Sequence, residues 1–164
     1  MITVVDLVGK LPVHPTLRYK TRSLDLLDRV VIHHTAGPTS QTPDQIARFH
    51  VNSNGWPGIA YHYLIAADGT IYKCWPASTV SYCVEKGNTP SLCVCLIGNF
   101  TQAGPPAPQW AAAVSLSRML LDAYDLTKLF GHKETPTSPP QSTACPGAKF
   151  DMNAFRFSVG ATRE

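Results

Sequence analysis

Short apolar runs separated by turn residues form the main hydrophobic pattern of the chain. The β-branched run 29–35 (RVVIHHT) and the continuously apolar run 92–97 (LCVCLI) each predict a buried strand. The runs 60–66 and 70–75 enclose an Asp-Gly dipeptide, which is typical of a two-residue hairpin turn. A further short strand is expected over 126–132, so the pattern predicts about five strands.

Three helical segments are expected between and after these strands. A helix over 43–52 is indicated because its first residue is a proline preceded by a threonine, a good N-cap. Apolar residues at helical spacing predict a second helix over 109–124, with Trp110 and Met119 on its buried face. A last helix is expected from residue 149 to about 159.

The predicted order is strand, helix, three strands, helix, strand, helix. This order describes an α/β fold of the mixed α+β kind, a single domain whose central mixed β-sheet of about five strands is flanked by helices. Residues 1–27 contain prolines and show no periodicity, so we expect an extended basic N-terminal arm followed by a folded domain over 28–164. The long loop 133–148 is unusual in a compact domain, and such loops often carry function.

Composition places the chain among ordinary globular proteins. It has 164 residues, of which 44% are hydrophobic, and a formal net charge of +3. Part of this charge lies in the arm, at Lys10, Arg18, Lys20 and Arg22. These residues either contact an anionic envelope surface or form a solvated lead-in. The net charge is too small to indicate a nucleic-acid partner.

Neither a membrane span nor a secretory signal is expected from the sequence. Its apolar runs are far shorter than the roughly 20 residues that a spanning helix needs. The N-terminal segment MITVVDLVGKLP has no basic residue before its apolar stretch, which Asp6 interrupts. We therefore expect synthesis in the cytoplasm, so that a target in the cell wall would be reached only after release.

Three residues with metal-binding side chains stand where predicted strands run into loops: His33, His132 and Cys145. Two imidazoles and a thiolate suit a catalytic zinc ion, which takes N and S donors and leaves one position to water. Spacing alone is weak evidence, and structural histidines with a buried cysteine are the alternative. His34 should point to the opposite face of its strand and should not share the metal.

Four sequence phrases occur in one order along the chain. They are VVIHHTAG at 30–37, GIAYHYLIAADGTIY at 58–72, LIGNF at 96–100, and GHKE with TACPG after residue 130. Together they resemble the type 2 N-acetylmuramoyl-L-alanine amidases, a superfamily that includes the peptidoglycan recognition proteins and short phage amidase endolysins. The resemblance covers about residues 28–157 and implies that 28–164 form a zinc amidase catalytic domain.

The resemblance also implies roles for individual residues. His33, His132 and Cys145 match the zinc ligands of the family. Tyr61 matches its active-site tyrosine, and Thr143 falls where relatives carry Thr or Lys beside the metal.

Two further residues are candidates for substrate binding. His62 follows the tyrosine in the family's Tyr-His phrase, with a hydrogen-bonded structural histidine as the alternative. Asn88 matches the second residue of a His-Asn pair in relatives, although Gly87 replaces the histidine here. No general base is assigned, because Glu85 and Glu134 are both expected to be surface carboxylates.

The chain contains five cysteines, and two of them are candidates for a disulfide. Cys83 and Cys93 flank a turn-rich segment, and pairing them would close a loop of about ten residues. Cys95 faces the same side of its predicted strand as Cys93 and is a competing partner. Two buried thiols are the alternative.

We therefore expect a monomeric, zinc-dependent amidase that cleaves the bond between N-acetylmuramic acid and L-alanine in bacterial peptidoglycan, most like a phage endolysin that lyses its host. Two alternatives stay open: a cytoplasmic amidase that recycles soluble muropeptides, and a non-catalytic peptidoglycan-binding module. Binding-only members of the superfamily typically lack the cysteine, so Cys145 favours catalysis.

Overall fold

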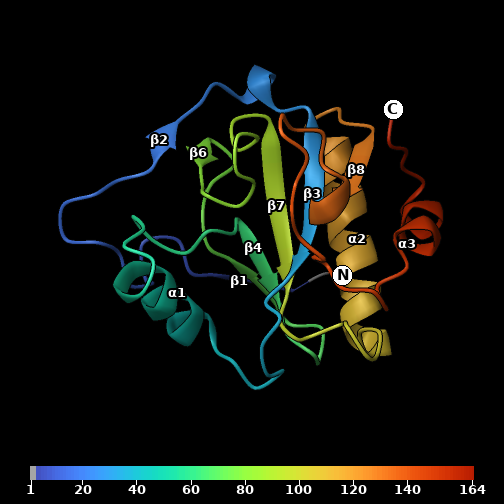
Figure 1. The fold of residues 1–164 in the computed structure, drawn as a ribbon, viewed down its shortest axis with the longest axis horizontal. Coiled ribbons are helices and arrows are strands. Elements are labelled where there is room, and N and C mark those ends of the chain that lie inside the picture. Colours follow the sequence, from blue (N-terminus) through green and yellow to red (C-terminus); the bar gives the residue numbers. More distant parts are fainter. Residues whose placement is uncertain (1–2) are drawn as a thin grey trace.

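The computed structural model describes residues 3–164, which form a six-stranded mixed sheet with helices on both faces (Figure 1). The strand order is β1-β5-β4-β7-β3-β8. The bounds of these strands are β1 Val4–Asp6, β3 Arg29–His34, β4 Tyr63–Ile65, β5 Ile71–Lys73, β7 Ser91–Leu96 and β8 Lys128–Gly131. A small second sheet pairs β2 (Lys20–Thr21) with β6 (Thr79–Val80).

Three α-helices and two short 3-10 turns complete the fold. They are α1 Pro43–Asn52, α2 Ala107–Ala123, α3 Met152–Val159, η1 Leu24–Leu26 and η2 His132–Glu134. Helix α1 begins with the expected threonine cap, because Thr42 Oγ1 accepts a hydrogen bond from the Gln45 amide. No helix of the described part of the chain has the length and apolar composition needed to cross a bilayer.

The two central strands, β3 and β7, are parallel and entirely buried. Burial on both faces explains the continuously apolar stretches 30–32 of β3 and 92–96 of β7. Alternate residues of β3 point to opposite faces. Val30 and Ile32 join the core beneath α2 and α3, whereas Val31 packs with Cys93 on the other face.

The predicted single-domain mixed fold is confirmed, and each predicted helix and strand is present within a few residues. The expected buried face of the helix now labelled α2 is partly wrong, since Met119 is 40% exposed while Leu116 and Leu120 are buried. The sheet has six strands because the arm adds β1, which pairs in parallel with β5 at the sheet edge. A strand of three residues is too short to show a period, so only tertiary pairing reveals it.

Arg22 was expected among the surface charges of the arm, but its side chain is buried. It donates hydrogen bonds of 2.5 to 3.0 Å to the carbonyl oxygens of Ala77, Asn88, Thr89 and Ser91. Its Nη2 also lies 3.1 Å from His62 Nε2. Arg22 therefore ties the arm to the loop between β5 and β7.

Replacing Arg22 by methionine should lower the free energy of unfolding by about 3 kcal/mol, because several buried carbonyl oxygens lose their donors. Urea denaturation measures this change. The matched control is Lys20→Gln, an exposed position on the same arm, which should change stability by less than about 0.5 kcal/mol. Equal, small effects of both substitutions would contradict this role.

Candidate metal centre and cleft

The carboxyl ends of two neighbouring parallel strands bring the two candidate histidines together. His33 is the next-to-last residue of β3, and His132 directly follows β8. Parallel neighbours end at the same edge of a sheet, where α/β proteins commonly bind ligands. The two imidazole ring centroids are 4.6 Å apart.

Cys145 returns to this edge from the long loop after η2. The Lys133 amide donates to the Cys145 carbonyl oxygen over 2.9 Å, which anchors the loop beside His132. Cys145 Sγ accepts a hydrogen bond from the His34 amide at 3.4 Å and lies 3.7 Å from His33 Nδ1. One donor atom from each of His33, His132 and Cys145 lies within 4.8 Å of the other two.

The hydrogen bonds of His132 leave one ring nitrogen available to a metal. Its Nε2 lies 3.1 Å from Gln141 Oε1, which can only accept, so Nε2 carries the proton and Nδ1 a free lone pair. The Gln141 amide is oriented in turn, because its Nε2 donates to the Glu85 carbonyl oxygen and to Thr137 Oγ1. The histidine is therefore held in the tautomer that binds a metal through Nδ1.

The electrostatics of the three donors also fit a zinc ion. Burial, followed by the neighbouring charge of His132, lowers the pKa of His33 well below its ordinary value and keeps this imidazole neutral. Burial raises the pKa of Cys145 to about 12, although the hydrogen bond from the His34 amide and the positive charge of Lys133 each lower this pKa. A bound cation would replace the thiol proton. Two neutral imidazoles and one thiolate make a tetrahedral zinc set with one position left.

Glu134, expected as a surface carboxylate, instead supports the turn that presents His132. Its Oε2 lies 2.6 Å from Arg156 Nη1 of α3 and accepts a hydrogen bond from the Gly131 amide at 2.9 Å. Burial raises the pKa of Glu134, but the hydrogen bonds from Arg156 and Gly131 outweigh it and lower the pKa overall. The ion pair connects α3 to the edge of the sheet that carries the metal centre.

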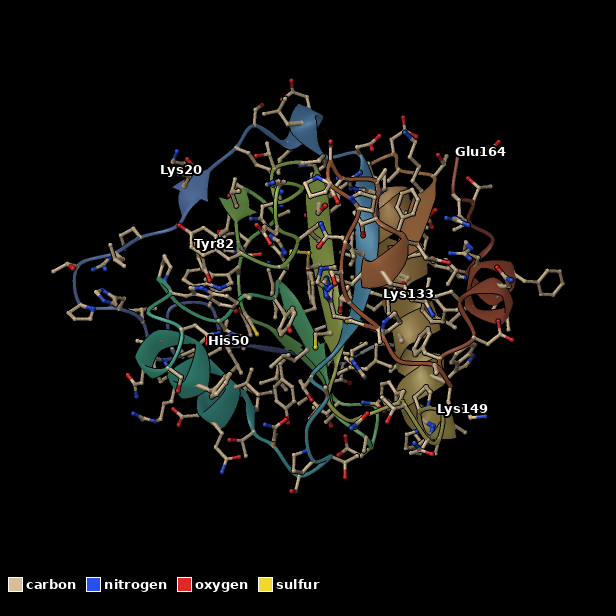
Figure 2. The ribbon with its side chains drawn as sticks, in the orientation of Figure 1. Lys20, His50, Tyr82, Lys133, Lys149 and Glu164 are labelled. Carbon is tan, nitrogen blue, oxygen red and sulfur yellow. A yellow bond between two sulfur atoms is a disulfide. The ribbon has the colours of Figure 1, made fainter. Side chains whose placement is uncertain are left out.

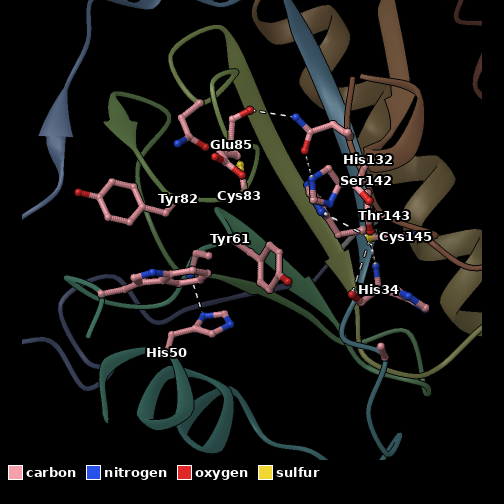
Figure 3. Close-up of a pocket in the computed structure, with 16 residues that line it drawn as sticks. His34, His50, Tyr61, Tyr82, Cys83, Glu85, His132, Ser142, Thr143 and Cys145 are labelled. Atoms are coloured by element: carbon pink, nitrogen blue, oxygen red, sulfur yellow. Dashed lines mark hydrogen bonds between the residues drawn. The ribbon is translucent and has the colours of Figure 1, made fainter. Parts of the chain in front are cut away.

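A cleft of about 680 Å³ opens above the three donors (Figure 3). Thr143 and Cys145 lie on one wall with His132, and Tyr61 faces them from the middle of the cleft. The Tyr61 ring centroid is 5.3 Å from that of His33. The cleft therefore places Tyr61 and Thr143, both predicted from the sequence, beside the candidate metal centre.

The two expected substrate contacts are placed differently. Asn88 lines the cleft, and its Oδ1 accepts a hydrogen bond from the Val84 amide at 2.7 Å. His62 is completely buried and does not line the cleft. Its Nδ1 accepts from the Cys93 amide at 3.0 Å, and its Nε2 lies 2.9 Å from the Thr79 carbonyl oxygen. A substrate contact by His62 does not fit this placement, and the structural alternative does.

No sequence motif marks the aromatic wall opposite the donors. His50 of α1, Trp56 and Tyr82 line this side of the cleft. His50 Nδ1 accepts a hydrogen bond from the Ala60 amide at 3.0 Å, and burial lowers the pKa of His50 to about 4. The position of His50 on the buried side of a predicted helix was the only available signal.

The structure joins Cys83 to Cys93 in a disulfide with a Cα–Cα distance of 6.5 Å. Cys95, the competing partner considered from the sequence, is a buried free thiol, as is Cys74. The disulfide ties the cleft-lining loop that carries Glu85 to the central strand β7.

Comparison with known proteins defines the class to which this fold and site belong. Residues 23–148 match the family Amidase_2, described as N-acetylmuramoyl-L-alanine amidase. The chain belongs to this family, and its resemblance to type 2 amidases is confirmed.

Two solved structures and one curated relative show how similar the chain is to individual members of this family. The Ph2119 endolysin of a Thermus scotoductus bacteriophage is 31% identical with a TM-score of 0.80, over 96% of this chain and 99% of that chain. The amidase LysC from Clostridium intestinale is 26% identical with a TM-score of 0.79, over 99% and 100%. Peptidoglycan-recognition protein SC2 of Drosophila melanogaster is 28% identical over 138 residues, which are 78% of this chain and 72% of the relative.

The buried His62 should make stability depend on pH. Burial lowers the pKa of His62 to about 3, although the Thr79 carbonyl raises it and Arg22 lowers it further. His62 therefore takes up a proton near pH 6.5 in the unfolded chain but only near pH 3 in the folded chain. Its contribution to the free energy of unfolding is complete above pH 6.5 and is lost as the pH falls toward 3. At pH 5 the loss is about 2 kcal/mol.

Replacing His62 by glutamine should reduce the fall in unfolding free energy between pH 6.5 and pH 5 by about 2 kcal/mol, measured by urea denaturation, because the other buried histidines keep their own share of it. A wild-type slope in His62→Gln would show that this histidine titrates alike in both states.

Proposed function

We propose that the chain is a zinc-dependent enzyme that hydrolyses the amide bond between N-acetylmuramic acid and L-alanine in bacterial peptidoglycan. The observation that carries the proposal is the convergence of His33, His132 and Cys145 at the base of the cleft. Membership of the amidase family supports the substrate class. The complete donor set supports catalysis over a role as a binding module.

The side chains around the cleft suit this reaction. His33, His132 and Cys145 would hold the zinc ion. When bound, zinc supplies Lewis acidity that polarises a carbonyl oxygen and lowers the pKa of water. Burial raises the pKa of Tyr61 well above its ordinary value, so its hydroxyl stays protonated and can donate to the oxygen on which negative charge develops.

Thr143 would orient the substrate, and Glu85 would accept a proton during the reaction. Thr143 Oγ1 accepts a hydrogen bond from the Cys145 amide at 3.1 Å, which leaves its own proton free to donate to substrate. Of the two carboxylates considered as the base, Glu134 is occupied by Arg156, whereas Glu85 lines the cleft. Glu85 is therefore the better candidate for the proton acceptor.

Two substitutions separate metal binding from catalysis. Cys145→Ser should lose both zinc and amidase activity, because a neutral hydroxyl is a poor zinc ligand. Tyr61→Phe should keep its zinc and lose about 10²- to 10³-fold in kcat, because one preorganised donor is removed. Elemental analysis measures the zinc, and mass spectrometry of digested peptidoglycan detects stem peptides with a free N-terminal L-alanine.

The matched control for removal of a buried thiol is Cys74→Ser, which should keep both zinc and activity. Full zinc content and full activity in Cys145→Ser would refute the donor set.

We also propose that the enzyme degrades the intact cell wall as a phage endolysin, after release from the cytoplasm, and that it acts as a monomer. The likeness to the Ph2119 endolysin over nearly the whole of both chains supports this role. A recycling amidase would instead prefer soluble muropeptides. Comparison of rates on intact sacculi and on small muropeptides distinguishes the two, and a strong preference for the fragments would overturn the endolysin role.

The exposed basic residues of the arm are proposed to favour anionic envelope surfaces. Lys20 lies at the periphery of the molecule on β2 (Figure 2), and Lys10 and Arg18 are also exposed. Replacing all three by glutamine should slow lysis of permeabilised cells several-fold at low salt but leave cleavage of purified peptidoglycan unchanged. Deleting the arm would be a poor test, because deletion also removes Arg22 and β1. Equal losses in both assays would contradict a surface role.

A further inference from the structure

His33 belongs to two groups of metal-binding side chains. Besides the group with His132 and Cys145, one of its ring nitrogens lies within 4.8 Å of the sulfur atoms of Cys83 and Cys93. The sheet register explains this proximity. Val31 pairs with Cys93 and His33 with Cys95, so His33 is the diagonal neighbour of Cys93 on the same face of the sheet.

One nitrogen of His33 is without a partner. Nδ1 lies 3.7 Å from Cys145 Sγ, whereas Nε2 is buried and makes no hydrogen bond to any described residue. The whole residue is 1% exposed. Buried polar atoms are nearly always satisfied, so the unpartnered Nε2 of a ring that lies within 4.8 Å of both sulfur atoms through one of its nitrogens indicates a place for a ligand.

We propose that reduction of the disulfide converts Cys83, Cys93 and His33 into a second site for a soft divalent ion such as zinc or cadmium. Cys83 lines the cleft and is 6% exposed, whereas Cys93 is fully buried, so a thiol reductant is expected to attack the Cys83 sulfur, with the Cys93 thiolate as the leaving group. Two reductant thiols yield two protein thiols and one reductant disulfide. Metal binding then displaces both protein thiol protons, and Cys₂His is a sufficient set for zinc with one position open.

The two sites compete for the same imidazole. A neutral imidazole offers a metal one nitrogen lone pair, so a metal ion held by Cys83, Cys93 and His33 withdraws a ligand from the centre that also uses His132 and Cys145. The enzyme would therefore be suppressed in a reducing compartment and become active where the disulfide forms. The second site itself does not depend on the proposed amidase function, and only its inhibitory effect does.

Cobalt binding tests the site without any activity measurement. In the Cys145→Ser variant, which lacks the thiolate of the first centre, the oxidised protein should show no thiolate-to-cobalt absorption. After reduction with a phosphine, the same variant should bind one equivalent of cobalt. Its absorption band should be about twice as intense as that of oxidised wild-type protein, which offers cobalt one thiolate.

Two controls separate this site from unspecific binding by free thiols. In the Cys145→Ser background, Cys83→Ser with Cys93→Ser should abolish the band. His33→Ala in the same background should weaken cobalt binding at least tenfold, although both thiols remain. The proposal is overturned if reduction adds no band, if His33→Ala leaves the affinity unchanged, or if circular dichroism shows the reduced variant unfolded in the presence of cobalt.

The inhibitory effect has a separate readout. Reduced wild-type protein should lose at least 90% of its amidase activity with equimolar cadmium, whereas oxidised protein should keep most of it. Equal inhibition of both forms would overturn the competition. Absence of amidase activity in every form would count against the proposed function and would leave the cobalt result standing.

Discussion

The parallel pairing of β3 with β8 is the constraint on which the site depends. These strands end side by side, so His33 and His132, which are far apart in sequence, face the same space at the carboxyl edge of the sheet. An antiparallel pairing would send the two imidazoles to opposite ends. The buried apolar residues 30–32 of β3 and 92–96 of β7 enforce this register, because a slip by one residue would turn His33 into the core beneath α2.

Polar contacts outside the donor set hold the edge in place. The Arg156–Glu134 ion pair connects α3 to the turn that presents His132, and Gln141 fixes the orientation of the His132 ring. On the other side of the cleft, Arg22 holds the loop that carries Glu85 and Asn88. The basic arm is therefore part of the scaffold of the site. Its exposed charges are proposed to have a separate role at anionic surfaces.

The sequence predicts those features that a local pattern or a family phrase can encode. The apolar runs of β3 and β7, the capped helix α1 and the candidate donors His33, His132 and Cys145 are of this kind. Features that depend on tertiary contacts were missed. The strands of the arm pair with distant partners, and the half-buried Glu134 is paired because α3 supplies Arg156. Similarly, the Tyr-His phrase does not reveal that His62 turns away from the cleft toward Arg22.

X-ray absorption at the zinc edge tests the central claim most directly, because it counts the atoms bound to the metal. For the purified, oxidised protein we predict one sulfur neighbour at about 2.3 Å and nitrogen or oxygen neighbours at about 2.0 to 2.1 Å, two of them with the scattering pattern of imidazole. A protein that binds no zinc, or a zinc ion without a sulfur neighbour and two imidazoles, would contradict the account.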